Sequence, residues 1–355
     1  MSRYWSDVVN TLTPYVPGEQ PLLDKLVKLN TNESPYPPSP RVMEAINAVS
    51  SDALRLYPDP ESVVLRQAIA ARCGLQTEQV FVGNGSDEVL ALAFMALLKH
   101  RLPLYFPDVS YSFYPVWSAM FDITYRTVPL GGDFSIDTAA YPVKNGGIIM
   151  PNPNAPTGML MSLDSIRALL QRSAESVVVI DEAYIDFGGQ SATHLIDEYD
   201  NLLVVQTLSK SRALAGLRVG FALGSKTLIE ALGRVKNSFN SYPLDVIAQR
   251  AALASIEDED YFRDSCMRVI NTRKTLCSAM GLLGFDVLPS GANFILASHS
   301  RYSARELFSS LRDQGILVRY FDKPRIDNHL RITIGTDEDN EALLIALRVL
   351  VGNDG

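Results

Sequence analysis

Short apolar segments recur along the chain between about residue 79 and residue 223, and most are four to six residues long. They are apolar on both faces and are separated by stretches of helix length. This pattern is typical of a mainly parallel sheet covered by helices. The predicted strands are Gln79–Val82, Leu102–Phe106, Gly147–Met150, Val177–Ile180, Leu202–Gln206 and Val219–Leu223. We therefore predict an α/β fold with a large domain built on this sheet.

The pattern changes after about Tyr242. A long helical stretch from Leu244 to Leu283, broken near Asp258, is followed by shorter mixed segments. The predicted strands there are Phe285–Leu288, Asn293–Leu296, Ile316–Arg319 and Leu330–Ile334, and the predicted helices are Ala304–Gln314 and Ala342–Val351. This part of the chain predicts a smaller α+β domain over residues 244–355.

The first 30 residues contain Pro14, Pro17, Gly18 and Pro21, which disfavour a regular core element. We predict an N-terminal arm over residues 1–30. Residues 31–40 (TNESPYPPSP) hold four prolines and must be irregular or extended. The large domain is therefore predicted to cover residues 31–243.

Composition excludes several classes of protein. The 355 residues carry a net charge of −8 and give a pI near 5.1, which argues against a nucleic-acid or anionic-membrane partner. The three cysteines and four histidines are dispersed, so we predict no metal site. No apolar run approaches the roughly 18 residues of a membrane span, and MSRYWSDVVN is unlike a secretory signal. We therefore expect a cytoplasmic protein.

A lysine stands directly after the strand Leu202–Gln206, in the segment Thr207-Leu208-Ser209-Lys210. Burial lowers the basicity of an amine, and a neutral amine is what imine formation requires. Arg218 follows eight residues later and, with the Ser209 hydroxyl, can hold a phosphate. Taken alone, Lys210 and Arg218 could equally be surface residues that flank a strand.

A carboxylate ends the strand before it, at Asp181 in VVVIDEAY. A buried carboxylate needs a cationic partner, and the protonated ring nitrogen of pyridoxal 5′-phosphate (PLP) is one. Tyr184 can bond the phenolic oxygen of the same cofactor. The rival role for Asp181 is a Mg²⁺ ligand, but the chain has no GxxxxGK[ST] phosphate loop.

Two further turns follow predicted strands. In GNGSDE (83–88), Gly85, Ser86 and Asp87 join a strand to a helix N-terminus, which is an anion site. In PNPNAPTG (151–158), Asn154 can reach a cofactor ring, and Tyr111 can stack on its face. Each turn alone is weak evidence, because ordinary turns look similar. Ligands of open α/β sheets bind at the carboxyl ends of strands, so the turns together predict a PLP enzyme with its cofactor as a Schiff base on Lys210.

With these residues identified, the chain resembles the fold-type-I aminotransferases, and within them the histidinol-phosphate aminotransferase branch. The similar segments are LTPY (12–15), LNTNESP (29–35), RLYPDP (55–60), GNGSDE (83–88), PNPNAPTG (151–158), DEAYIDF (181–187), TLSKSRALAGLRVG (207–220), ANFIL (292–296) and LRITIGT (330–336). The resemblance implies a seven-stranded sheet and a homodimer. Two positions depart from it: Ala155 stands where many relatives have asparagine, and Ser211-Arg212 follows the lysine.

The resemblance also implies roles for residues. Lys210 binds the cofactor and moves the proton, Asp181 pairs with the ring nitrogen, and Tyr184 contacts the ring oxygen. The other implied cofactor residues are Gly85, Ser86, Asp87, Tyr111, Asn154, Ser209 and Arg218, together with Tyr57, which reaches the neighbouring subunit's site. Arg331 holds the substrate anion, with Arg319, Tyr15 and Asn293 around it. The implied reaction converts L-histidinol phosphate and 2-oxoglutarate to imidazole acetol phosphate and glutamate.

Three other functions remain open. An aromatic-amino-acid aminotransferase shares the fold and differs in pocket shape. A threonine-phosphate decarboxylase would release CO₂ without a keto acid. A PLP-fold regulator would need a DNA-binding domain, for which 30 residues are too few.

Overall fold

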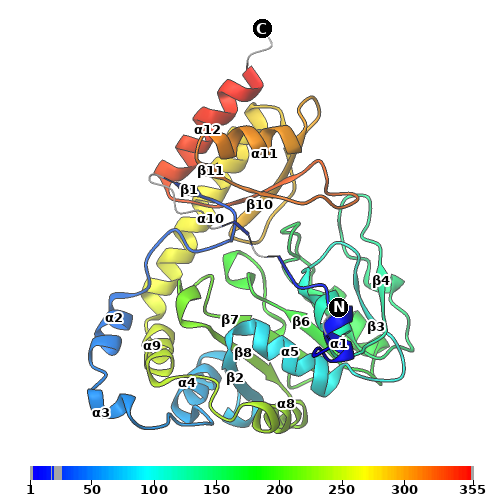
Figure 1. Cartoon of the computed structure of the whole chain (residues 1–355), viewed down its shortest axis with the longest axis vertical. Coiled ribbons are helices and arrows are strands. Elements are labelled where there is room, and N and C mark those ends of the chain that lie inside the picture. Colours follow the sequence, from blue (N-terminus) through cyan, green and yellow to red (C-terminus); the bar gives the residue numbers. More distant parts are fainter. Residues whose placement is uncertain (1–2, 17, 20–25, 353–355) are drawn as a thin grey trace.

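The computed structural model describes residues 3–16, 18–19 and 26–352. Two bodies are visible in Figure 1. The large body comprises helices α2–α9 around the seven-stranded sheet, and the small body comprises helices α10–α12, the sheet of four strands and the strands β1 and β11.

The central sheet has the strand order β2-β8-β7-β6-β5-β3-β4, and β8 runs antiparallel to the other six strands. The strands are β2 (Val80–Asn84), β3 (Leu104–Pro107), β4 (Tyr125–Val128), β5 (Ile148–Pro151), β6 (Val178–Asp181), β7 (Leu202–Thr207) and β8 (Val219–Gly224). The mainly parallel sheet and its six predicted strands are confirmed. The strand β4 was not predicted, because three of its four residues are exposed at the sheet edge and it lacks an apolar run.

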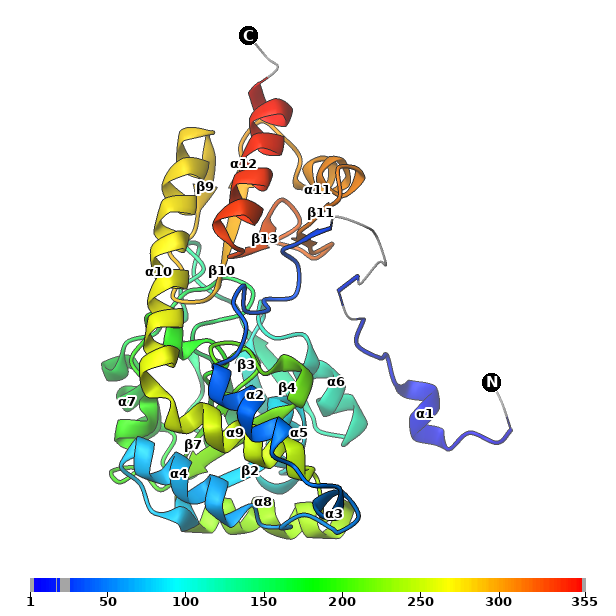
Figure 2. The same ribbon diagram turned by 90° about the vertical axis from the view of Figure 1, so that its left-hand side faces the viewer.

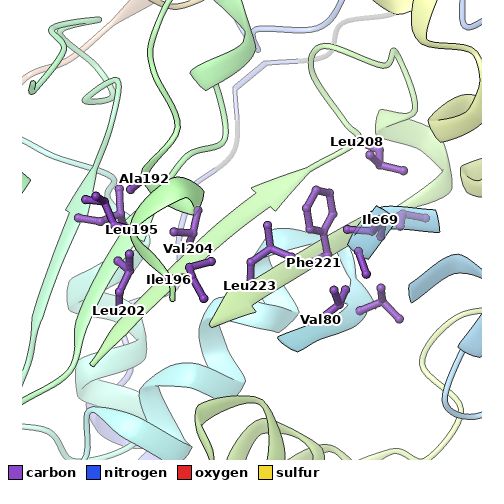
Figure 3. Packing of buried hydrophobic residues seen from close by; sticks show 14 of the residues in the cluster. Ile69, Val80, Ala192, Leu195, Ile196, Leu202, Val204, Leu208, Phe221 and Leu223 are labelled. Atoms are coloured by element: carbon purple, nitrogen blue, oxygen red, sulfur yellow. The ribbon is translucent and has the colours of Figure 1, made fainter. Parts of the chain in front are cut away.

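Helices cover both faces of this sheet. In β6, Val178 and Ile180 pack into one apolar cluster and Val179 into another, as the alternation of a strand requires. The helices of the large body are α2 (Pro40–Asn47), α3 (Ser51–Leu54), α4 (Val63–Cys73), α5 (Gly85–Leu97), α6 (Phe113–Met120), α7 (Leu163–Arg172), α8 (Lys226–Phe239) and α9 (Val246–Glu257). Figure 3 shows the first cluster, where Ile69 of α4 packs near Phe221 of β8. Apart from the edge strand β4, the strands are therefore mostly buried on both sides, and their ends are free to carry chemistry.

The predicted break near Asp258 is confirmed. The helix α9 ends at Glu257, and the Asp258 side chain accepts a hydrogen bond from the Tyr261 amide at the start of α10 (Glu259–Leu282). Ala248 and Ala251 of α9 belong to the core of the large body. This helix thus packs on the large body, although it lies in the range predicted for the small domain.

The small body is an antiparallel sheet of order β12-β13-β10-β9, packed on three helices. Its strands are β9 (Phe285–Val287), β10 (Phe294–His299), β12 (Arg319–Tyr320) and β13 (Leu330–Thr333), and its other helices are α11 (Ala304–Asp313) and α12 (Asp337–Gly352). The predicted strand Ile316–Arg319 is split into β11 (Ile316–Leu317) and β12, which belong to different sheets. Figure 2 shows α10 running from the large body along the small one.

The N-terminal segment is only partly an arm. The helix α1 (Asp7–Thr11) has no buried residue and stands apart from both bodies in Figure 2. However, β1 (Val27–Lys28) pairs with β11, and Leu29 is buried in the core of the small body. Pro17 and Pro21, which supported the arm prediction, lie outside the described residues. No helix in the described part of the chain is both long and apolar enough to cross a membrane.

Candidate active site

A cavity of about 200 Å³ lies where the carboxyl ends of β2, β6 and β7 face the small body. The sheet side supplies eight of the predicted residues to its wall: Ser86, Asp87, Tyr111, Asp181, Tyr184, Ser209, Lys210 and Arg218. Tyr15, Arg319 and Arg331 line it from the other side. Residues far apart in the sequence meet here because parallel strands bring their carboxyl ends to one edge.

Lys210 lies directly beyond β7, and its Nζ donates a hydrogen bond to the carbonyl oxygen of Thr31 at 3.0 Å. Burial and, after it, the nearby Arg331 guanidinium lower the pKa of Lys210 to about 8. A substantial fraction of this amine is therefore neutral near neutral pH. Such an amine can act as a nucleophile and as a base.

Asp181 ends β6 and is buried. One carboxylate oxygen accepts a hydrogen bond from the Tyr114 hydroxyl at 2.9 Å, and the other accepts one from the Ala183 amide at 3.3 Å. Burial raises the pKa of Asp181 to about 6. Within the described residues this carboxylate makes no ion pair. A cationic ring nitrogen would supply the missing charge.

The turn between β2 and α5 lies against Arg218. The Arg218 guanidinium pairs with Asp87 at 3.1 Å, and the Tyr111 hydroxyl donates to the other oxygen of Asp87 at 2.8 Å. A Cβ on Gly85 would lie 2.5 Å from Arg218 Nη2, and one on Gly220 would lie 2.2 Å from the Ser86 amide nitrogen. Glycine is needed at position 220 so that β8 can approach the N-terminus of α5, and at position 85 because its φ is +78°. Amide groups, a guanidinium and a helix N-terminus together form an anion cradle.

Arg319 and Arg331 occupy directly opposite positions on β12 and β13. Arg331 donates to the carbonyl oxygen of Asn30 at 2.8 Å, and Arg319 donates to that of Val16 at 3.3 Å. Among the residues that the structure describes, the buried Nε of Arg331 has no hydrogen-bond partner. Like charges directly opposite on a sheet repel each other, and neither arginine has a carboxylate partner among the described residues. The pair is therefore suited to binding an anionic ligand.

Tyr184 is held from two sides. Its hydroxyl accepts a hydrogen bond from Asn32 Nδ2 at 3.1 Å, and its ring packs edge-on against Phe294 with centroids 5.0 Å apart. Asn293 does not line the cavity. Instead, its Nδ2 donates to the Asn32 carbonyl oxygen at 3.0 Å, while its Oδ1 is buried without a partner. Asn293 thus supports the wall from behind.

Two predicted residues lie elsewhere. Asn154 is fully buried, and its amide group donates to the Val109 carbonyl oxygen at 3.0 Å, so Ala155 and Pro156 line the cavity in its place. Asn154 therefore does not line the cavity, because its amide satisfies a buried carbonyl group, and its predicted ring contact stays a prediction. Tyr57 is 82% exposed and stacks on Tyr242 with centroids 4.7 Å apart, outside the cavity of its own chain. Its predicted contact with a neighbouring subunit stays a prediction.

Residues 24–347 match the family of class I and II aminotransferases. This chain belongs to that family. The aminotransferase is 61% identical over 347 residues to histidinol-phosphate aminotransferase 1 of Hydrogenovibrio crunogenus, with 98% of each chain covered. It is 58% identical over 350 residues to histidinol-phosphate aminotransferase 1 of Pseudomonas aeruginosa, covering 99% of this chain and 100% of the relative.

A solved structure with the same fold is the histidinol-phosphate aminotransferase of Sinorhizobium meliloti in complex with pyridoxal-5′-phosphate. Its TM-score is 0.89 at 23% identity, with 100% of this chain and 99% of that chain covered. At this identity the likeness shows the fold alone. The large and small bodies of the aminotransferase are therefore those of fold-type-I enzymes.

The residues of this aminotransferase fit PLP. Lys210 supplies the amine, and Asp181 is a buried carboxylate that makes no ion pair among the described residues. The anion cradle formed by the Gly85 turn, the N-terminus of α5 and Arg218 (the Gly85 cradle) fits a phosphate. Among the described residues, no group of three or more metal-ligating side chains is placed to hold a metal ion. The donor set therefore favours an organic cofactor with an anionic end.

Sequence reasoning missed Tyr114 and Asn32. Tyr114 is buried in the aromatic helix α6, where nothing in FYPVW distinguishes it from a core residue. Asn32 has a φ of +56°, and asparagine tolerates this left-handed region better than most residues. The LNTNE segment therefore carried a usable signal, whereas Tyr114 could be found only from the fold.

Proposed function

We propose that this aminotransferase transfers the amino group of L-histidinol phosphate to 2-oxoglutarate, with PLP as its cofactor. The observation that carries the proposal is the buried Lys210 amine, with its pKa of about 8, facing the unpaired Arg319–Arg331 pair across one cavity. The relatives named for this activity, at 58–61% identity over nearly the whole chain, support the choice of substrate.

The cofactor, when bound, supplies an electron sink that stabilises negative charge on the substrate carbon. Lys210 takes the proton from that carbon and returns it, because its amine is buried, close to neutral and at the cavity wall. Asp181 keeps a proton on the ring nitrogen through its negative charge. Tyr184 bonds the ring oxygen, and the Gly85 cradle with Arg218, Ser86 and Ser209 holds the phosphate end.

The arginine pair binds the substrates in turn. A guanidinium has a planar fork of donors that fits a phosphate and a carboxylate equally well. Arg331 has an unsatisfied Nε, and Arg319 stands beside it. The same pair therefore binds the phosphate of the amino donor and the carboxylate of the keto acid.

We further infer that the enzyme works as a homodimer in the cytoplasm. Exposed apolar side chains support the dimer: Leu54, Leu56, Tyr57, Phe239 and Tyr242. Tyr57 and Tyr242 are stacked and point away from the core of their own chain. In the dimer, Tyr57 reaches the phosphate end of the neighbouring subunit's cofactor.

An aromatic amino donor is the second candidate. Tyr15, Tyr111 and Phe321 line the cavity, and Tyr15 stacks on Phe113 with centroids 4.4 Å apart. Aromatic walls pack against a benzene ring as readily as against an imidazole. The 58–61% identity to relatives named for histidinol phosphate, rather than the ring contacts, favours histidinol phosphate.

The experiment is a half-reaction on the purified, PLP-loaded protein. The absorbance of the lysine-bound cofactor is recorded, and L-histidinol phosphate is added without a keto acid. Bleaching of that band, reversed by 2-oxoglutarate, is the expected result. Bleaching by phenylalanine or tyrosine but not by histidinol phosphate would establish the aromatic alternative, and the absence of any band after incubation with PLP would refute the proposal.

A further inference from the structure

Arg273 lies on α10 outside the cavity and is buried. Its Nη1 donates to the carbonyl oxygen of Phe187 at 2.9 Å and also to that of Ala292. It has no carboxylate partner among the residues that the structure describes. Burying a guanidinium that binds only neutral carbonyls is costly, so a structural role alone would be served as well by an apolar residue.

The two carbonyl groups belong to segments that come from different parts of the chain. Phe187 ends a turn of 3₁₀ helix, Ile185–Phe187, that directly follows Tyr184. Although this turn belongs to the large body, the Phe187 ring packs in the core of the small body. Ala292 directly precedes Asn293 and packs with Phe294 and Tyr184. Arg273 therefore joins the segment that carries Tyr184 to the segment behind the substrate wall.

The contacts form a closed circuit. Asn32 donates to the Tyr184 hydroxyl, and Asn293 donates to the Asn32 carbonyl oxygen. Thr333 fixes Asn32 through two further bonds, of 3.0 and 3.1 Å. Arg273 bonds the carbonyl groups of Phe187 and Ala292, which lie in both segments. The hydroxyl is thus held by Asn32, and the backbone that carries the ring is held by Arg273.

We propose that Arg273 is a positioning residue, which fixes the Tyr184 hydroxyl relative to the cofactor ring by tying the Phe187 and Ala292 carbonyl groups together. This inference rests on the proposed role of Tyr184 as a donor to the ring oxygen. Arg273 touches neither substrate nor cofactor. It acts by fixing the position of Tyr184 between the large and small bodies.

The test is the pH titration of the lysine-bound cofactor's absorbance in Arg273→Met. A hydrogen bond from Tyr184 to the ring oxygen would stabilise the unprotonated form of the lysine-bound cofactor. Weakening this bond therefore raises the pH midpoint at which the cofactor loses its proton. Tyr184→Phe removes the bond completely and should raise the midpoint by about one to two pH units, the value for a hydrogen bond to a charged acceptor. Arg273→Met is expected to raise the midpoint by about half a unit. A wild-type midpoint in a folded, PLP-loaded Arg273→Met protein would overturn the proposal.

Arg66→Met is the matched control. Arg66 also donates to two backbone carbonyl groups, those of Val80 at 2.7 Å and Thr77 at 2.9 Å, and in addition pairs with Glu61 at 3.6 Å; none of these residues lines the cavity. Arg66→Met should leave the midpoint unchanged, whatever its effect on the melting temperature. An equal shift in Arg66→Met would reduce the effect of Arg273 to general destabilisation and refute its positioning role. If Arg273→Met fails to fold, Arg273→Lys, which keeps the charge but is shorter and lacks the planar fork of donors, is used with the same criteria.

Hydrogen exchange in the cofactor-free protein separates this inference from the proposed function. Arg273→Met is expected to raise exchange in peptides that cover residues 183–189 and 290–296, relative to Arg66→Met. Unchanged exchange there would contradict the circuit, whatever the cofactor does. If exchange rises but Tyr184→Phe leaves the midpoint unchanged, the proposed role of Tyr184 fails and Arg273 loses its link to the cofactor.

Discussion

The sheet side of the cavity and the small-body side carry their charges differently. On the sheet side, Arg218 pairs with Asp87 at 3.1 Å, and Lys210 lies in the same cavity as Asp181. On the small-body side, Arg319 and Arg331 stand opposite each other and, among the described residues, hydrogen-bond only to backbone carbonyl groups of the N-terminal segment. The charges of the sheet side nearly cancel within the protein, whereas the small-body side has a net positive charge that an anionic ligand can neutralise.

The difference indicates a division of work. A balanced site holds its groups in place before any ligand arrives, which suits chemistry that depends on fixed geometry. An unbalanced site gains most when an anion enters, because the anion relieves the repulsion between the arginines. We therefore assign the reaction to the sheet side and substrate recognition to the small body.

Lys210→Ala should have the largest effect on the sheet side. Removing the amine abolishes covalent attachment of the cofactor and proton transfer, so turnover should fall by about 10³-fold or more. Absorbance spectra and steady-state rates measure the two losses. A variant that turned over at the normal rate would show that the sheet side does not perform the chemistry.

Arg331→Ala should damage recognition in both half-reactions. Truncating a buried charged donor costs about 2–3 kcal/mol, so kcat/KM for histidinol phosphate and for 2-oxoglutarate should each fall by about 10²-fold. Stopped-flow traces of each half-reaction give the two values. Arg305→Ala is the control, because Arg305 is exposed and already pairs with Asp322 at 2.8 Å. Unchanged kinetics for either substrate would refute the shared anion site.

The two sides should nevertheless be coupled through the pKa of Lys210. This pKa lies below that of a free lysine, so the neutral amine predominates only above about pH 8. The rate of PLP attachment to the cofactor-free protein should rise with pH and level off above about 8. At pH 7, the neutral fraction of an amine with a pKa of about 8 is about 300-fold larger than that of an amine with a pKa of 10.5.

Arg331→Met should move that plateau to higher pH, because the guanidinium disfavours protonation of Lys210. Arg305→Met should not move it. A plateau that stays in place in Arg331→Met would show that the two sides are electrostatically independent.

Thermal shifts in the cofactor-free protein should sharpen the division further. A dicarboxylate such as glutarate at about ten times its Kd adds about 1.4 kcal/mol of stability by mass action. The resulting rise in Tm should disappear in Arg331→Met and persist in Arg218→Met. The reverse outcome would place carboxylate recognition on the sheet side.

Tyr114→Phe should have the smallest effect. The Tyr114 hydroxyl stabilises the ionised form of Asp181, so its loss should raise the pKa of Asp181 above 6 by about one unit or less. Infrared titration of the protonated carboxyl band in the cofactor-free protein measures the change. Tyr141→Phe, which removes a buried hydroxyl outside the cavity, serves as the control. A fall in this pKa would contradict the assigned hydrogen bond.

The sequence alone determined the sheet and the strand ends that carry Lys210, Asp181 and Arg218. Buried parallel strands have continuous apolar runs in the sequence, so polar residues that directly follow such runs are easy to identify. The edge strand β4 has no such run, so the pattern did not reveal it. Helix and strand periodicity is local, and the local part of the fold was therefore readable.

The tertiary structure alone decided what depends on the approach of distant segments. It placed Arg319 opposite Arg331, turned Asn154 towards Val109, brought Tyr114 to Asp181 and joined Tyr184 to Ala292 through Arg273. It also put β1 in the small body and α9 on the large one. Such pairings are set by packing between elements, and hydrogen-bond partners far apart in the sequence leave no periodic trace in it.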